Sequence, residues 1–172
     1  MKKILLIAAC GLLLHGAASA VQAVKAKRST YRDEVYGFSL ETPRFAAREA
    51  NGRSIPLMVF GPAKNNFSDN LNVMVMDKAG GREKYRGLNS AELAQKGFKV
   101  VEDKDATVSG RDAIVLEYTG RIQGRDMHFL SLGVLDKEQT YLFTYTASED
   151  TYKNVAAEFR ASLESIKIND AP

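Results

Sequence analysis

The chain has few of the residues that most often carry chemistry in proteins. It contains a single cysteine, Cys10, two histidines, no tryptophan and four prolines in 172 residues. If Cys10 is removed during maturation, no disulfide, thiolate nucleophile or cysteine metal site remains. We find no GxSxG, HExxH or EF-hand pattern and no phosphate-binding glycine loop, so no known catalytic motif and no cofactor is predicted.

The first 20 residues have the pattern of a signal peptide. Lys2 and Lys3 precede an apolar stretch from Ile4 to Leu14, and Ala18-Ser19-Ala20 forms a small-residue cleavage site before Val21. The apolar stretch is too short to span a bilayer, which takes about 20 residues. We therefore expect cleavage between Ala20 and Val21 and a periplasmic protein.

A second processing route remains open, because Ile7-Ala8-Ala9-Cys10 resembles a bacterial lipobox. Lipid attachment at Cys10 would instead give a membrane-anchored lipoprotein. Cleavage after Ala20 is favoured, since it explains both the length of the apolar stretch and the small residues that end it.

The charge balance gives no support for nucleic-acid binding. The net charge of the whole chain is +3, but the first 20 residues contribute two lysines and no acid, which leaves 22 basic and 21 acidic groups. Residues 21–34 form a basic segment that we expect to be a flexible leader. Membrane contact is expected only through this leader or a lipid at Cys10.

Residues 35–168 are predicted to form one domain. Short strands are expected at 35–43, 55–61 and 71–76, and an antiparallel meander at Asp112–Thr119, Met127–Leu135 and Thr140–Thr146. Apolar residues spaced by three and four predict a helix that begins after Ser148 and packs on the sheet. Its apolar face comprises Tyr152, Val155, Ala156, Phe159, Leu163 and Ile166.

The segments between the early strands are harder to assign. Residues 62–70 and 77–87 are expected to be polar loops, and Asn89 with Glu92 resembles a capping box that starts a short helix. Residues 99–102 and 106–108 are expected to flank an acidic turn. Within the two loops, candidate partner contacts are Phe67, Arg82, Lys84 and Arg86, although Phe67 is also suited to packing on its own domain and a charged run to simple solvation.

Two other residues have both a structural and a functional interpretation. His128 is the only histidine beyond the signal peptide. A catalytic histidine needs a nucleophile and an orienting acid, and no motif here supplies them, so His128 is expected to be structural. Asp126, two residues before it, could bind a metal only if the fold brought other ligands near, so this pair alone does not predict a metal site. Glu117 lies in an apolar run, where a buried carboxylate would mark a site, but we expect it to occupy the outward, solvated position of an alternating strand.

Four segments resemble the PsbP-like superfamily, including its bacterial DcrB-like branch. These are Tyr36–Pro43, Val108–Tyr118, Asp136–Thr144 and Phe159–Ile166. The resemblance implies an α+β fold, with an antiparallel sheet between helices in an α/β/α sandwich, and a binding, assembly or adaptor role without a catalytic set. The metal ligands of photosynthetic members have no counterpart here.

The sequence thus predicts a non-catalytic, monomeric envelope protein that binds another exported or envelope protein. The competing hypothesis is an envelope hydrolase or small-ligand binder that uses Glu117 or His128 at a site between the sheet and the loops.

Overall fold

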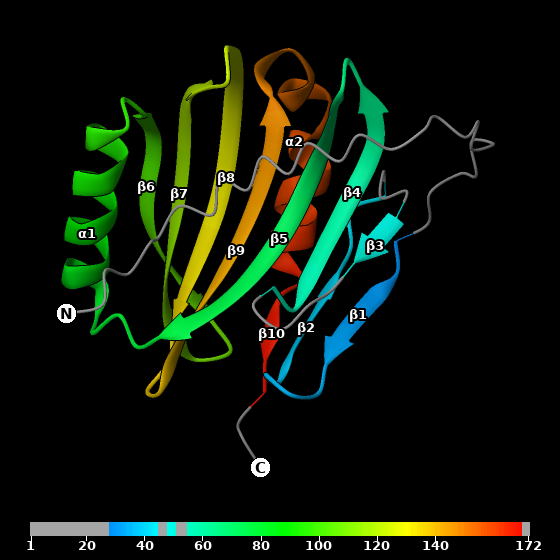
Figure 1. The fold of residues 1–172 in the computed structure, drawn as a ribbon. Helices are drawn as coiled ribbons and strands as arrows, with labels where there is room; N and C mark the ends of the chain where they lie inside the picture. Colours follow the sequence, from blue (N-terminus) through cyan, green and yellow to red (C-terminus); the bar gives the residue numbers. More distant parts are fainter. Residues whose placement is uncertain (1–27, 45–47, 51–54, 170–172) are drawn as a thin grey trace.

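The fold is built on a seven-stranded antiparallel sheet, as the computed structural model shows for residues 28–44, 48–50 and 55–169 (Figure 1). The strand order across this sheet is β3-β4-β5-β9-β8-β7-β6. In chain order the strands are β3 (Arg48–Ala50), β4 (Leu57–Lys64), β5 (Phe67–Asp77), β6 (Lys99–Val108), β7 (Arg111–Ile122), β8 (Arg125–Leu135) and β9 (Gln139–Ser148).

The predicted meander is confirmed as β7, β8 and β9, which pair in sequence order. Two-residue turns connect β6 to β7 and β7 to β8, and their residues have positive φ: Ser109 and Gly110, then Gln123 and Gly124. Such turns match the twist of antiparallel strands. The three strands are buried along most of their length on both faces, which explains their continuous apolar composition.

One helix covers each face of the sheet, so the predicted α+β class and sandwich arrangement are confirmed (Figure 1). Helix α2 (Glu149–Glu164) packs on β8 and β9, and helix α1 (Arg82–Gln95) packs on β6 and β7 on the other face. Tyr152 and Phe159 of α2 are buried in the larger core, with Val155, Ala156 and Leu163 partly buried against it, as its apolar spacing predicts. Within the described part of the chain, no helix is both long and apolar enough to cross a membrane.

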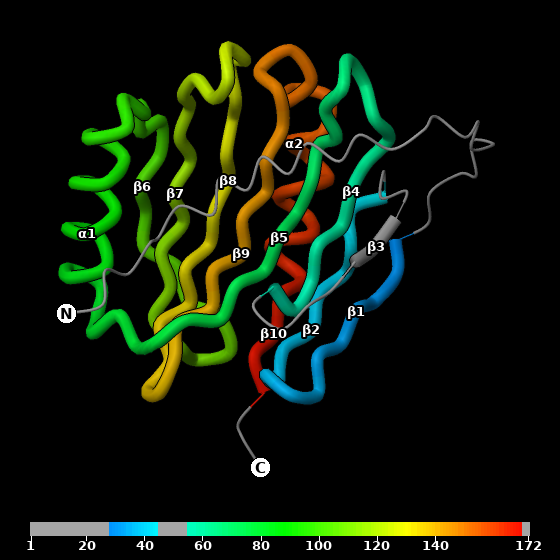
Figure 2. The backbone as a smooth tube through the Cα atoms, in the orientation of Figure 1, coloured from blue at the N-terminus to red at the C-terminus, as the bar shows by residue number. Residues whose placement is uncertain are grey.

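A small second sheet contributes to the same core as α2. It has the order β1-β2-β10, with β1 (Thr30–Asp33), β2 (Phe38–Glu41) and β10 (Lys167–Ile168), and β10 lies beside β2 close to the C-terminus (Figure 2). Phe38 and Leu40 of β2 are fully buried in the larger core. The prediction that residues 21–34 form a flexible leader is therefore wrong for Thr30–Asp33, which pair with β2.

Helix α1 corrects the prediction for residues 77–87. The helix begins at Arg82 rather than after Asn89, and Asn89 lies in its interior, where its side-chain amide donates to the Tyr85 carbonyl at 2.7 Å. Tyr85 and Leu93 are buried against the sheet. This tertiary burial outweighs the poor helix propensity of Gly87, since packing of an apolar face supplies most helix stability in proteins.

Two further boundaries differ from the predictions. Residues 99–108 form one strand, β6, whose register shifts between Val100 and Glu102 instead of breaking at an acidic turn. Residues 62–70 are mostly strand, with a tight turn at Asn65 and Asn66, both of positive φ. In each case a hydrogen-bonded neighbouring strand holds a charged or polar segment extended, because strand propensity depends on context.

Candidate functional site

A half-open groove lies between β6 and the C-terminal half of α2. Helix α2 packs mainly on β8, β9 and β2, and it reaches Glu102 of β6 and Glu117 of β7 through the Arg160 side chain. The cavity has a volume of about 580 Å³, within the range of roughly 300–1,000 Å³ that is typical of ligand sites. It is lined by Lys104, Ala106, Thr107, Val108, Ser109, Val115, Leu132, Arg160, Leu163, Glu164, Ile166 and Lys167.

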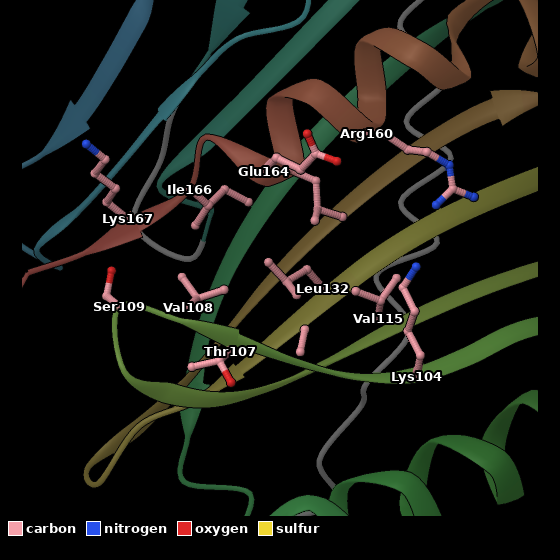
Figure 3. Close-up of a pocket in the computed structure, with 12 residues that line it drawn as sticks. Lys104, Thr107, Val108, Ser109, Val115, Leu132, Arg160, Glu164, Ile166 and Lys167 are labelled. Carbon is pink, nitrogen blue, oxygen red and sulfur yellow. The ribbon is translucent and has the colours of Figure 1, made fainter.

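The groove has an apolar floor and a charged rim (Figure 3). Val115 and Leu132 form the floor from β7 and β8, and Leu163 and Ile166 extend it from the end of α2. Lys104 and Arg160 stand together at one end, whereas Lys167 and Ser109 lie at the other. An elongated molecule with an apolar body would fit this shape.

Beyond the Arg160 end, Glu117 forms the centre of a buried ionic cluster. Its side chain is only 8% exposed. One carboxylate oxygen accepts hydrogen bonds from the Tyr152 hydroxyl at 2.8 Å and from His128 Nε2 at 2.8 Å, and the other accepts one from Arg160. The prediction that Glu117 points outward is therefore wrong, and both of its oxygens have partners.

His128 bridges two carboxylates within this cluster. Its Nε2 contacts Glu117 and its Nδ1 lies 2.9 Å from Glu149 Oε2, while the ring stacks on Tyr152 with 3.4 Å between ring centres. Both nitrogens donate only when the imidazole is protonated, because the neutral ring has a single N–H. His128 is 7% exposed and so is integrated into the core.

Strand register explains why these residues meet. Glu117 pairs with Leu130, and His128 is two residues before Leu130 on the same strand, so both side chains project from the same sheet face as diagonal neighbours. Tyr152 and Arg160 are two helical turns apart on α2, which lies over that face. The cluster therefore fastens α2 to the β7–β8 pair.

The environment of Glu117 shifts its pKa downward. Burial would raise the pKa of this carboxyl, but hydrogen bonds from Tyr152 and His128 and the charge of Arg160 outweigh burial and lower it. The pKa of Tyr152 is raised by burial and by the hydrogen bond that its hydroxyl donates to Glu117. The cluster thus favours an ionised glutamate beside a neutral phenol.

The lowered pKa of Glu117 predicts a pH dependence of stability. A carboxyl with a depressed folded-state pKa stabilises the fold above its unfolded value, near 4.5, and this contribution is lost as the pH falls through the folded value. We expect the difference in unfolding free energy between the wild type and Glu117→Gln to be largest near neutral pH and to shrink below about pH 4. Urea denaturation from pH 3 to 7 measures it; a difference that stays constant over this range would contradict the assignment.

The predicted contact residues Arg82, Lys84 and Arg86 lie on α1, outside the groove. Arg82 pairs with Asp112 at 3.0 Å and Arg86 with Asp103 at 2.8 Å, so two of the three hold α1 against β6 and β7. The side chain of Lys84 is exposed. Whether these residues also contact a partner stays a prediction.

Phe67, the fourth predicted contact residue, lies at the start of β5. It is partly buried and packs against the smaller core, with the Arg125 guanidinium 5.3 Å from its ring centre. The remaining predicted positions, Cys10 and the Ala20–Val21 cleavage site, lie outside the described residues. In the described segments, no group of three or more histidine, cysteine, aspartate or glutamate side chains is placed to hold a metal ion.

Sequence reasoning missed the groove and most members of the cluster. Tyr152 was recognised only as part of an apolar helical face, and Arg160, Glu149, Lys104 and Lys167 carried no signal. One signal was present. Ala113, Val115 and Glu117 are spaced by two along β7 and therefore project from the same face, and Ala113 and Val115 are buried in the larger core.

Comparison with known proteins identifies the fold. No protein-family profile and no curated relative matches the chain. Among solved structures, it resembles the cyanobacterial PsbP protein CyanoP from Synechocystis, with a TM-score of 0.62 and 16% identity over 90% of this chain and 99% of that one. LpqN of Mycobacterium tuberculosis, described as involved in cell envelope biogenesis, gives 0.65 and 16% over 83% and 91%.

A third similar structure is a putative regulator of unknown function from Pseudomonas aeruginosa, with a TM-score of 0.56, 16% identity, and coverage of 84% of this chain and 98% of that one. At such low identities these likenesses establish the fold and not the activity. The chain therefore has a PsbP-like fold, in agreement with the resemblance of its sequence segments.

Proposed function

We propose that this chain is an exported, non-catalytic accessory protein of the bacterial cell envelope. It binds other proteins in an assembly, adaptor or chaperone-like role. It is periplasmic after cleavage before Val21, monomeric, free of cofactors and part of the DcrB-like branch. The likeness to LpqN, which is described as involved in cell envelope biogenesis, supports the envelope setting.

The main support for this proposal is that the polar atoms of Glu117 and His128 in the buried cluster already contact other side chains of the protein. A general base or nucleophile must face a reacting group rather than a structural partner. Here both oxygens of Glu117 and both nitrogens of His128 are engaged by other side chains of the protein. Converging ionisable groups in a cleft would otherwise favour catalysis, but these groups serve to hold α2 in place.

The edge formed by α1 and β6 is the surface best suited to a protein partner. Three of the four exposed large hydrophobic side chains in the described residues lie there: Leu88, Val100 and Val101, which are 40%, 41% and 56% exposed. Lys84 of α1 adds an exposed charge. β6 also ends the sheet, and exposed apolar residues at an edge are typical of interaction sites.

Site-specific crosslinking in living cells tests the partner surface. A photoreactive amino acid at position 88 or 101 is expected to give a discrete, higher-mass adduct, because these side chains contact the partner. The matched control is position 35, where Val35 is 87% exposed between β1 and β2. Adducts absent from 88 and 101, or equally strong at 35, would contradict the assignment.

A second candidate function is the binding of a small molecule. The half-open groove with its apolar floor favours it. This function is compatible with a protein partner at α1 and β6, because the groove opens on the opposite sheet face from α1.

A further inference from the structure

We propose that His128 acts as a pH-sensitive latch on the first turn of α2. The latch is closed while the imidazole is protonated, and it opens at Glu149 when the ring loses a proton. It lies on the sheet face that α2 covers, opposite the face that α1 covers. The latch and the partner surface at α1 and β6 can therefore be tested independently.

The ring of His128 contacts two carboxylates and can donate to both only when it carries two protons. Nε2 lies 2.8 Å from Glu117 Oε1, and Nδ1 lies 2.9 Å from Glu149 Oε2. An ionised carboxylate only accepts hydrogen bonds, so each contact needs an N–H on the ring. The neutral ring has one N–H, and its other nitrogen would direct a lone pair at a negatively charged oxygen. Deprotonation therefore breaks one of the two contacts.

Burial decides which contact opens. The Glu117 side chain is 8% exposed, whereas that of Glu149 is 54% exposed. A buried carboxylate that loses a donor cannot replace it with water, but Glu149 can turn into solvent. The neutral ring therefore keeps its proton on Nε2, facing Glu117, and releases Glu149. Because Glu149 is the first residue of α2, its release loosens the start of the helix.

Charged and aromatic neighbours from α2 and β6 surround the latch. The Arg160 guanidinium opposes a second positive charge, but it is shared between Glu117 and Glu102 of β6. The Tyr152 ring stacks on the imidazole with 3.4 Å between ring centres, and the face of an aromatic ring attracts a cation. Lys99 of β6 is aligned with the imidazole across β7 but is exposed, so solvent and salt screen its charge.

The charges on the other neighbouring strands have partners of their own. On the same strand as the histidine, Asp126 pairs with Arg121 of β7 at 3.8 Å. Asp69 of β5 accepts a hydrogen bond from Thr151 at 3.0 Å, and the β9 residue opposite the histidine is the uncharged Ala147. Among the described residues, the two carboxylates are therefore the charged groups that the ring nitrogens contact.

The latch makes the stability of the start of α2 depend on pH. Its contribution is present where the ring is protonated and is lost as the pH rises through the range of about 5 to 8 in which histidines titrate. The contribution of Glu117 has the opposite sign, since it is lost as the pH falls. Both contributions are present together only at mildly acidic pH, where α2 is held most firmly.

Nitrogen NMR of the mature protein, purified without a polyhistidine tag, tests the protonation states directly. In a chain that begins at Val21, His128 is the only histidine, so the imidazole signals report on it alone. We expect both ring nitrogens to carry protons at pH 5.5 and only Nε2 to carry one at pH 8.5. An unprotonated Nδ1 at pH 5.5, or a proton on Nδ1 at pH 8.5, would overturn the latch.

Hydrogen exchange tests the consequence for α2. We expect the protection factors of the amides of residues 153–155, whose helical hydrogen bonds close the first turn, to fall about fivefold between pH 5.5 and 8.5, because a charge-assisted hydrogen bond to a half-exposed carboxylate is lost. Glu149→Gln removes the charge that the latch holds and is expected to reduce this change to less than about twofold.

The matched control is Asp150→Asn. Asp150 is also an exposed acid in the first turn of α2, but its side chain bonds Ser148 instead of the imidazole. This variant is expected to keep the change of about fivefold. Constant protection in the wild type over this pH range, or an equal fall in Glu149→Gln and the wild type, would overturn the proposal.

Discussion

Replacing Glu117 with alanine is expected to lower the free energy of unfolding by about 3 kcal/mol, because it leaves buried partners of a charged acceptor unpaired. Arg160 would lose its buried carboxylate, and Tyr152 and His128 would each lose a 2.8 Å hydrogen bond. Urea denaturation at pH 7 measures the change. The larger part of the effect comes from the buried Tyr152 hydroxyl and His128 Nε2, which lose their acceptor, since Arg160 is 42% exposed and keeps its ion pair with Glu102.

The matched control is Glu138→Ala, which removes an exposed glutamate from the turn between β8 and β9. Surface changes of this kind stay within about 0.5 kcal/mol. If Glu117→Ala were as mild as Glu138→Ala, the cluster would not fasten α2 to the sheet, and its residues would be free for another role.

Replacing Gly133 with alanine is expected to cost about 3 kcal/mol, at the upper end of the usual cost of overpacking a core. An added Cβ would lie 2.3 Å from the Tyr85 hydroxyl oxygen and 2.4 Å from the adjacent ring carbon. Tyr85 is a fully buried residue on the sheet-facing side of α1. The absence of a side chain at Gly133 therefore sets how closely α1 approaches β8.

Two variants make this test specific. Gly87→Ala, in the interior of α1 with open space around it, is expected to stabilise by about 0.5–1 kcal/mol through helix propensity. The cost of Gly133→Ala is expected to fall in a Tyr85→Leu background, because the clashing ring is gone. An unchanged cost in that background would show that the clash with Tyr85 is not the cause.

Glu117 and Gly133 also show which structural features could be predicted from the sequence. The alternation of apolar residues predicts β7 to β9 and α2 because each pattern is local. The start of α1 could not be predicted, since it depends on Tyr85 packing over Gly133, which lies far along the chain. The favoured interpretation of Glu117 failed for a related reason: β7 is apolar on both faces, so alternation could not show which face Glu117 occupies.

The groove could not be predicted from the sequence. It exists because α2 packs mainly on β8 and β9, and that placement depends on the second sheet and on the contact between Arg160 and Glu117. Both are long-range features. The PsbP-like resemblance predicted the sandwich correctly but carried no information about this opening.

We propose that the protein works through its surfaces and that the buried cluster supports the fold. The most direct test is the yield of the adduct from position 88 in cells, compared between Val101→Glu and a His128→Gln variant whose folding is first verified by circular dichroism. We expect the His128 variant to capture the partner at the wild-type yield and Val101→Glu to lose it. Loss of capture in the folded His128 variant, with full capture by Val101→Glu, would contradict the account.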